Sequence, residues 1–381
     1  MYKKLLLGSL AITIMVGTSF AQDIASNDGQ MTSVDLANSE SSVFGDLALT
    51  ESSESNTDEV GSSNVCDNLP EGVFCDDFTG STLDIEKWWY MRNHWGNGKT
   101  YKNNGVIPEN VIVKNNKAYF GANGDNYSGD LKGVRKANPD LYQDQPGTRV
   151  GGCIVSDKYY GSGSYEVRMK LPPKLGVCTA LWTFHYQEVY SDDPDYADYM
   201  DQGFQPQGSD DMGWYVTPNH EIDIEIPTAL KGQNEYTECS YRNARLNTWV
   251  GELNYTDEFI DMGFEQNDGK FHDYRFDWHT GGNGEKPRVD FYVDGKFIYS
   301  STKDIPFIKG RFTLGTWFPQ WAGGKADFDR IFLEIDWVKI TPFNEPNDKT
   351  VRETFKNAGM TKCQNAEDNK AGKRHCKLAT F

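Results

Sequence analysis

Three acidic residues alternate with three isoleucines in the segment His220–Pro227, which reads HEIDIEIP. Successive side chains of a β-strand point to opposite faces, so Glu221, Asp223 and Glu225 would share one face while the isoleucines enter a core. Four strand residues place the two glutamates ~13 Å apart between Cα atoms. Side chains that lean together would bring their carboxyl groups to on the order of 5–6 Å, which suits a double displacement on a glycosidic bond.

That chemistry needs one carboxylate to attack the anomeric carbon and a second group to protonate the leaving oxygen and then activate water. Asp223 holds like charges close together, which raises at least one pKa and couples the titrations. A glutamate that keeps its proton near neutral pH suits the acid role. The alternative is that the three acids form only the solvated face of an edge strand. His220 has the opposite parity to Glu221, so we expect it to make a structural hydrogen bond.

Further alternating segments predict the strands that must position these acids. They are Ser164–Leu171, Phe271–Trp278 and Arg288–Val293. Asp294-Gly295 and Asn115-Asn116 predict tight hairpin turns, because these residues readily take positive φ. No helical periodicity of useful length appears between Cys66 and Ile340, so the sequence predicts an all-β fold. We expect a β-sandwich of jelly-roll type, concanavalin A-like, with a concave substrate cleft.

Composition divides the chain into four parts. Residues 1–21 resemble a cleavable signal peptide, with two lysines before an apolar run and Ala21 at the end. Residues 22–64 are rich in Ser, Asp and Glu and predict a disordered acidic linker. Residues 65–345 form the expected catalytic domain, and residues 346–381 a basic C-terminal tail. Within the domain, an acidic insertion between Tyr190 and Asn219 lacks alternation and predicts a long loop.

The bulk charge limits the partners. A formal net charge of −18 argues against nucleic acid, whose binding depends on Lys and Arg. No stretch after residue 21 is apolar enough to span a membrane. We therefore expect a secreted protein, extracellular or periplasmic and monomeric, whose partner is a polysaccharide or glycan.

Seven cysteines in an exported chain predict disulfides with one thiol left over. The close pairs Cys66/Cys75 and Cys363/Cys376 are the expected bridges. Cys363, His375 and Cys376 could instead bind a metal, although their spacing matches no zinc pattern.

Several motifs together resemble glycoside hydrolase family 16, which includes lichenases, laminarinases, agarases, porphyranases and endo-β-galactosidases. Glu-Ile-Asp-Ile-Glu resembles the family's active-site strand. The supporting motifs, in family order, are Phe78–Trp88, Gly163–Pro172, Phe271–Trp278, Phe291–Lys296 and Glu334–Ile340. The likeness covers roughly Asp76 to Thr341. It implies that Glu221 is the nucleophile, Glu225 the general acid/base, and Asp223 the residue that orients and tunes the pair.

The resemblance also implies an endo-acting, retaining enzyme with an aromatic cleft. Flat rings cover the apolar faces of sugars while polar groups bind the hydroxyls. The expected substrate-binding residues are Trp182, Trp317, Trp321, Trp95, Arg242 and Asn243, with Arg245 beside them. One residue between Asp223 and Glu225 favours β-1,4 cleavage over β-1,3, in a substrate such as β-glucan. The acidic insertion is not typical of lichenases and keeps galactan-type and mucin-type substrates open.

The resemblance further implies a structural calcium at Asp336, while no cofactor is expected for catalysis. One carboxylate is weak evidence, since calcium prefers several oxygen ligands. Three alternative functions remain. A transglycosylase would use an acceptor sugar in place of water, a glycan-binding protein would need the cleft but not both glutamates, and a structural export protein would need neither.

Overall fold

The computed structural model describes residues 65–93, 103–131, 133, 148–186, 188–210, 213–228, 240–251, 254–319, 325–350 and 360–361. In this part of the chain most residues lie in strands. Its helical segments are the short helix α1 (Tyr196–Asp201) and the 3-10 turn Pro108–Asn110. None of the described helices is long and apolar enough to cross a membrane. The all-β prediction is confirmed, whereas the signal peptide, the linker and most of the basic tail lie outside the described residues.

One layer of the sandwich, here called the front sheet, carries the acidic strand. In spatial order it contains β20 (Met360–Thr361), β2 (Trp88–Met91), β6 (Arg149–Tyr160), β18 (Gly310–Trp317), β8 (Cys178–His185), β12 (His220–Pro227), β13 (Asn243–Val250) and β14 (Tyr255–Asp261). All these neighbours are antiparallel. β3 (Asn103–Val106) runs parallel to β6 at one end.

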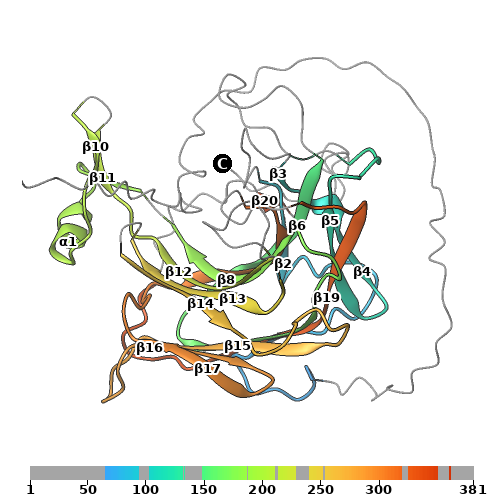
Figure 1. Ribbon diagram of the computed structural model, residues 1–381. Coiled ribbons are helices and arrows are strands. Elements are labelled where there is room, and N and C mark those ends of the chain that lie inside the picture. Colours follow the sequence, from blue (N-terminus) through green and yellow to red (C-terminus); the bar gives the residue numbers. More distant parts are fainter. Residues whose placement is uncertain are drawn as a thin grey trace, which may run out of the picture.

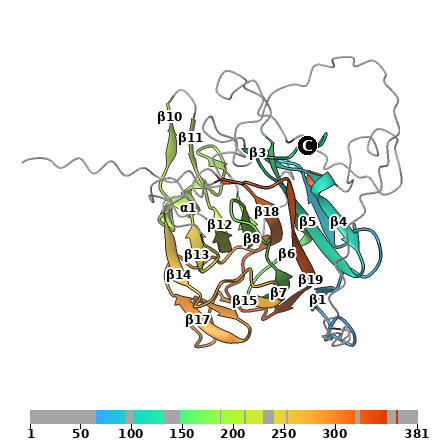
Figure 2. The same cartoon turned by 45° about the vertical axis from the view of Figure 1, so that its right-hand side comes forward.

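The second layer, here called the back sheet, is also antiparallel. Its strands are β4 (Val111–Lys114), β5 (Lys117–Asn123), β19 (Arg330–Pro342), β7 (Gly163–Lys170), β15 (His272–His279), β16 (Arg288–Val293) and β17 (Lys296–Ser301), with β1 (Phe74–Asp76) beside β19. A bridge between Asn123 and Val150 joins the two layers, so hydrogen bonding continues from one to the other. Figure 1 shows β8, β12, β13 and β14 of the front sheet lying over β15, β16 and β17, and Figure 2 shows β13 and β14 above β15 and β17 from a second side, which confirms the jelly-roll sandwich.

The core between the layers explains the parity of the acidic strand. Ile222 and Ile224 of β12 belong to the same buried apolar cluster as Tyr165 and Phe276 of the back sheet. The rings of Tyr165 and Phe276 stack with centroids 4.7 Å apart. Burying each such apolar side chain stabilises the fold by about 1.5–3 kcal/mol. Moving β12 by one residue would turn every isoleucine away from this core and put the three acids in their place, so its register is strongly specified.

Both predicted hairpin turns are confirmed. Asn115 and Asn116 have φ of 52° and 54° between β4 and β5, while Asp294 and Gly295 have φ of 51° and 72° between β16 and β17. Two successive positive φ angles are the geometry of a primed turn, whose twist matches that of the flanking strands.

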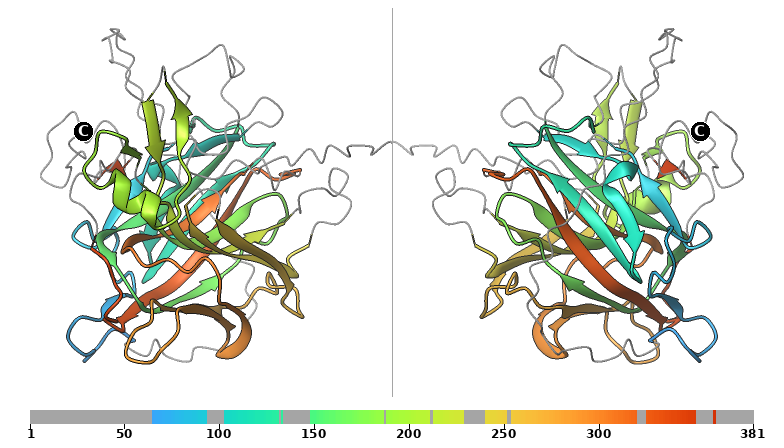
Figure 3. Two further views of the ribbon diagram at one scale, coloured as in Figure 1. Left: turned by 90° about the vertical axis from the view of Figure 1, so that its left-hand side faces the viewer. Right: turned by 90° about the vertical axis from the view of Figure 1, so that its right-hand side faces the viewer.

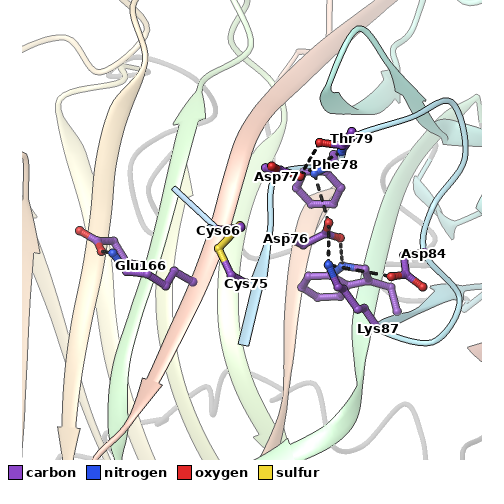
Figure 4. Close-up of a disulfide and its surroundings, with 11 residues drawn as sticks. Cys66, Cys75, Asp76, Asp77, Phe78, Thr79, Asp84, Lys87 and Glu166 are labelled. Carbon is purple, nitrogen blue, oxygen red and sulfur yellow. Dashed lines mark hydrogen bonds and ion pairs between the residues drawn. A yellow bond between two sulfur atoms is a disulfide. The ribbon is translucent and has the colours of Figure 1, made fainter. Parts of the chain in front are cut away.

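The Cys66–Cys75 disulfide is also confirmed (Figure 4). It joins the start of the described chain to β1, and next to it Asp76 accepts a hydrogen bond from the Trp88 indole at 2.6 Å. Cys153 and Cys178 are free and buried, so the expectation of one leftover thiol is wrong. An odd number of cysteines requires at least one free thiol but allows more. Cys363, His375 and Cys376 lie outside the described residues.

The acidic insertion is more structured than predicted. It forms β9 (Val189–Tyr190), α1, β10 (Gln207–Ser209) and β11 (Gly213–Val216), and the three strands make a small separate sheet. Val189, Phe204 and Val216 build its own apolar cluster, which the strand-period pattern did not reveal. Figure 3 shows β10 and β11 rising above the sandwich. Since β11 leads into β12, this subdomain stands at the Glu221 end of the acidic strand.

Packing also continues past residue 345. Asp348 accepts hydrogen bonds from Ser162 and Thr280, and Lys349 forms a bridge with Ile308. The first residues assigned to the basic tail are therefore part of the sandwich.

Candidate active site

Strand β12 lies in the middle of the front sheet, between β8 and β13, with no register shift on either side. Glu221, Asp223 and Glu225 lie on the face turned away from the core, as their spacing predicted. Their exposed fractions are 1 %, 2 % and 1 %. The alternative of a solvated edge-strand face is therefore wrong, because the strand is central and the acids are buried.

Each acid has defined neighbours across the sheet. Glu221 pairs with Phe184 of β8 and Trp249 of β13. Asp223 pairs with Trp182 and Asn247, and Glu225 with Ala180 and Arg245. Directly paired residues present their side chains on the same face at about 4.5–5.5 Å between Cβ atoms. Glu221 is thus bordered by aromatic rings on both sides, whereas Asp223 and Glu225 have amide and guanidinium donors beside them on β13.

The two glutamates are held in a similar way. Oε2 of Glu221 accepts a hydrogen bond from Nδ2 of Asn219 at 3.2 Å. Oε2 of Glu225 accepts bonds from Nη1 of Arg245 and Nδ2 of Asn247, each at 3.2 Å. In the described structure, Oε1 of each glutamate is buried without a hydrogen-bond partner. Such an oxygen costs about 1–3 kcal/mol, and that cost makes it a candidate for a functional role.

Burial governs the titration of all three acids. It raises the pKa of Glu221 to about 8 and that of Glu225 to about 7, and it raises the pKa of Asp223 as well. The hydrogen bond from Asn219 opposes the shift at Glu221, and the charge of Arg245 opposes it at Glu225. Because the three groups are close, their protons are shared by the cluster. Near neutral pH the cluster can supply both a proton and a charged carboxylate.

Two of the predicted tryptophans lie on the carboxylate face. Trp182 lies beside Asp223, and Trp317 pairs with Cys178 at the Glu225 end. Both indoles are buried in one apolar cluster with Cys153. The two indoles are therefore buried neighbours of the carboxylates on the same face of the sheet. Trp95 and Trp321 lie outside the described residues.

Of the two predicted polar residues, Asn243 is the first residue of β13 and Arg242 directly precedes that strand. Nη2 of Arg242 donates to both carboxylate oxygens of the exposed Asp261, at 3.0 and 3.1 Å. Asn243 pairs with Asp261 across the strands, two residues beyond Arg245 on the same face. A sugar would have to compete with Asp261 for Arg242.

Sequence reasoning missed Asn219, Asn247 and the aromatic pair Trp249 and Tyr255. The rings of Trp249 and Tyr255 stack with centroids 4.2 Å apart, and Tyr255 is 43 % exposed at the rim. The alternation in β13, which reads NARLNTWV, was the available signal. It places one arginine, two asparagines and one tryptophan on one face, but only the register shows that this is the carboxylate face.

His220 has the structural role expected from its parity. Its Nδ1 lies 3.3 Å from the carbonyl oxygen of Pro218, and its ring packs edge-on against Phe307. Burial lowers its pKa to about 3, so the ring is neutral.

The carboxylate of Asp336 already has cationic neighbours. Its oxygens lie 3.5 Å from Nε of Arg168 and 4.0 Å from Nζ of Lys117. Among the described residues, no group of three or more His, Cys, Asp or Glu is arranged to hold a metal ion. A calcium ion at Asp336 would have to displace two cations, so these side chains do not favour it, and calcium there stays a prediction.

Comparison with known proteins identifies relatives among β-glucanases. A β-glucanase of Acetivibrio thermocellus is 26 % identical over 201 residues, which are 52 % of this chain and 47 % of that protein. A β-glucanase of Paenibacillus macerans is 25 % identical over 195 residues, 49 % of this chain and 62 % of that protein. The chain thus spans about half the length of the curated relatives it matches. No protein-family model matches it.

Solved structures were compared in the same way. A lichenase from a mouse hindgut metagenome covers 71 % of this chain and 99 % of its own, with 20 % identity and a TM-score of 0.47. The β-glucanase of Bacillus licheniformis covers 72 % and 99 %, with 20 % identity and a TM-score of 0.45. Similarity in sequence is therefore the stronger link between this chain and the β-glucanases.

Proposed function

We infer that the chain belongs to glycoside hydrolase family 16, to which its motifs and its β-glucanase relatives both point, and we propose that it is an endo-acting, retaining β-glycan hydrolase. One observation carries this proposal. Two buried glutamates lie on one face of a central strand, and each has one oxygen that accepts a hydrogen bond and one that has no partner among the described residues. Burying two carboxyl groups in this way costs the fold free energy, but it suits a reaction that needs two carboxyl groups.

The reaction would run in two steps. In the first, an oxygen of Glu221 bonds to the anomeric carbon, the glycosidic bond breaks, and Glu225 gives its proton to the leaving oxygen. In the second, Glu225 takes a proton from water, the water oxygen bonds to the anomeric carbon, and the ester to Glu221 breaks. Asn219 would orient Glu221, and Arg245 with Asn247 would orient Glu225. The spacing of 5–6 Å between the carboxyl groups stays a prediction.

The proposed substrate is a neutral β-linked polysaccharide, with β-glucan favoured by the relatives' names. The net charge of −18 opposes anionic polymers and nucleic acid. Residues 1–21 would direct export, which would place a monomeric enzyme outside the cell or in the periplasm.

The decisive test compares Glu221→Gln and Glu225→Gln with the parent chain on lichenan, laminarin and β-galactan, with product sizing. Each variant should lose at least three orders of magnitude in kcat, because an amide can neither attack nor transfer the proton. Both should still bind an oligosaccharide in calorimetry. Glu258→Gln, an exposed acid on β14, is the matched control and should keep parental activity.

Two results would contradict the proposal. Hydrolysis by Glu221→Gln at the parental rate would show that this residue does not take part in the reaction. If neither the parent chain nor the two Gln variants bound oligosaccharide, the carboxylate face would be inaccessible to sugar. Proton NMR of the first product tests the mechanism separately. Retention predicts the β anomer at early times, and prompt release of the α anomer excludes a double displacement.

A further inference from the structure

Arg245 forms a bridge between the acid/base candidate and a third strand. Its Nη1 lies 3.2 Å from Oε2 of Glu225. Its Nε and Nη2 lie 2.8 and 2.7 Å from the two oxygens of Asp257 on β14. A bidentate pair of this kind fixes the guanidinium plane. One guanidinium therefore contacts the carboxylates of both Glu225 and Asp257.

We propose that Arg245 is a positioning residue that stabilises the anionic form of Glu225, and that Asp257 limits this effect by neutralising part of its charge. The inference rests on the proposed function of Glu225 and adds a pair of residues that set its acid strength. Neither residue needs to touch the substrate.

The charged and titratable groups around Glu225 are few. Arg245 and Asp257 face it from β13 and β14, Asp223 and Glu221 from its own strand, and Cys178 from β8. Among the described residues, Arg245 is the cation within ion-pair distance of Glu225. Burial keeps Cys178 as a neutral thiol by raising its pKa. The acid strength of Glu225 thus depends on one cation, which favours its charged form, and on three carboxyl groups, which oppose it.

This balance matters most between the two chemical steps. After the first step Glu221 is an uncharged ester, and Glu225 has lost its proton to the leaving oxygen. A cation at 3.2 Å stabilises that anion in a buried site. The same cation makes Glu225 a stronger acid, so it lowers the pH above which the first step fails. Asp257 offsets this increase in acid strength, so Arg245 and Asp257 together would allow Glu225 to act as the acid in the first step and as the base in the second.

The test uses two variants with opposite expected effects. Arg245→Gln should raise the pKa of Glu225 and move the alkaline limb of kcat/KM upward by about one pH unit or more. Asp257→Asn should leave the cation unneutralised and move the same limb downward. Arg245→Lys keeps the positive charge, so its alkaline limb of kcat/KM should lie closer to the parental pH than that of Arg245→Gln. With an activated aryl glycoside, Arg245→Gln should also slow the second step and increase the burst.

A measurement without substrate separates this inference from the proposed function. In the full-length protein with ¹³C-labelled glutamate side chains, the Glu225 carboxyl signal, identified by its loss in Glu225→Gln, should titrate at higher pH in Arg245→Gln and at lower pH in Asp257→Asn. Arg242→Gln, which breaks an Arg–Asp pair on the same two strands, should leave that titration at its parental position. Shifts in the same direction, or no shift, would overturn the inference. A parental chain that hydrolyses no glycan would overturn only the proposed function.

Discussion

At the scale of single residues, the carboxylate cluster works against stability. Glu221, Asp223 and Glu225 are buried side by side, and in the part of the chain that the structure describes each glutamate has one oxygen without a hydrogen-bond partner. Neighbouring like charges and removal from water both favour the protonated forms. Isoleucines on the opposite face of the same strand offset the cost by fixing β12 in the core. A strand that held these acids only for packing would be more stable with amides.

This contrast gives a stability prediction for Glu221→Gln. Burial raises the folded-state pKa of Glu221 to about 8, above its ordinary value of 4.5. The parental chain therefore has its full stability only below that ordinary value and loses stability as pH rises toward 8. The variant should melt at a higher temperature, by about 2–4 °C for each kcal/mol gained, and its advantage should grow from pH 5 to pH 8.

Calorimetry at both pH values checks this result. Glu258→Gln, an exposed acid, should change stability by less than about 0.5 kcal/mol. A Glu221→Gln advantage that is the same at pH 5 and pH 8 would show that burial of the charge is not its cause.

At the scale of elements, the edge strand β14 extends the carboxylate face. Glu221, Trp249 and Tyr255 follow one another across β12, β13 and β14. Trp249 is covered, whereas Tyr255 presents its ring at the rim. The subdomain formed by β9, α1, β10 and β11 stands at this same end of β12. A long glycan held at Glu221 would therefore meet an aromatic surface at this rim.

Tyr255→Ala tests whether this rim binds sugar. Loss of an aromatic platform costs about 1 kcal/mol, so KM for a long oligosaccharide should rise about five- to tenfold, with kcat nearly unchanged. Substrates too short to reach β14 should be unaffected. Phe297→Ala, which removes an even more exposed ring on β17 of the back sheet, is the matched control. An equal rise of KM for short and long substrates would rule out a distal sugar site at Tyr255.

At the scale of the whole molecule, the sandwich is closed by contacts between distant parts of the chain. The front and back sheets meet at the Asn123–Val150 bridge, and the Cys66–Cys75 disulfide ties the start of the described chain to β1. β1 pairs with β19 near its C-terminal end. The disulfide thus stabilises the strand that joins the N-terminal and C-terminal ends of the fold.

Replacing both Cys66 and Cys75 with serine should lower the free energy of unfolding by about 2–3 kcal/mol, the entropy expected for a loop of this length. Urea unfolding followed by tryptophan fluorescence measures the change. A reducing agent should destabilise the parental chain by a similar amount and leave the double variant unchanged. An unchanged midpoint in the variant would show that β1 is held by its strand pairing alone.

The sequence by itself determined the features that depend on local periodicity. Alternation placed Glu221, Asp223 and Glu225 on one face, because side chains of a strand alternate whatever it packs against. Asn115-Asn116 and Asp294-Gly295 determined their turns through backbone preference, and the short separation of Cys66 and Cys75 made their bridge predictable. These properties are set within a few residues.

Only the tertiary structure decided which distant side chains meet those acids. The register of β12 with β8 and β13 places Trp249 beside Glu221 and Arg245 beside Glu225. It also makes β12 central, so that the acids are buried and their pKa values rise. The acidic insertion folded into a helix and a small sheet because its apolar residues cluster across turns, which no single period reveals. Strand register depends on the packing of the whole core, and that packing is not encoded in any one segment.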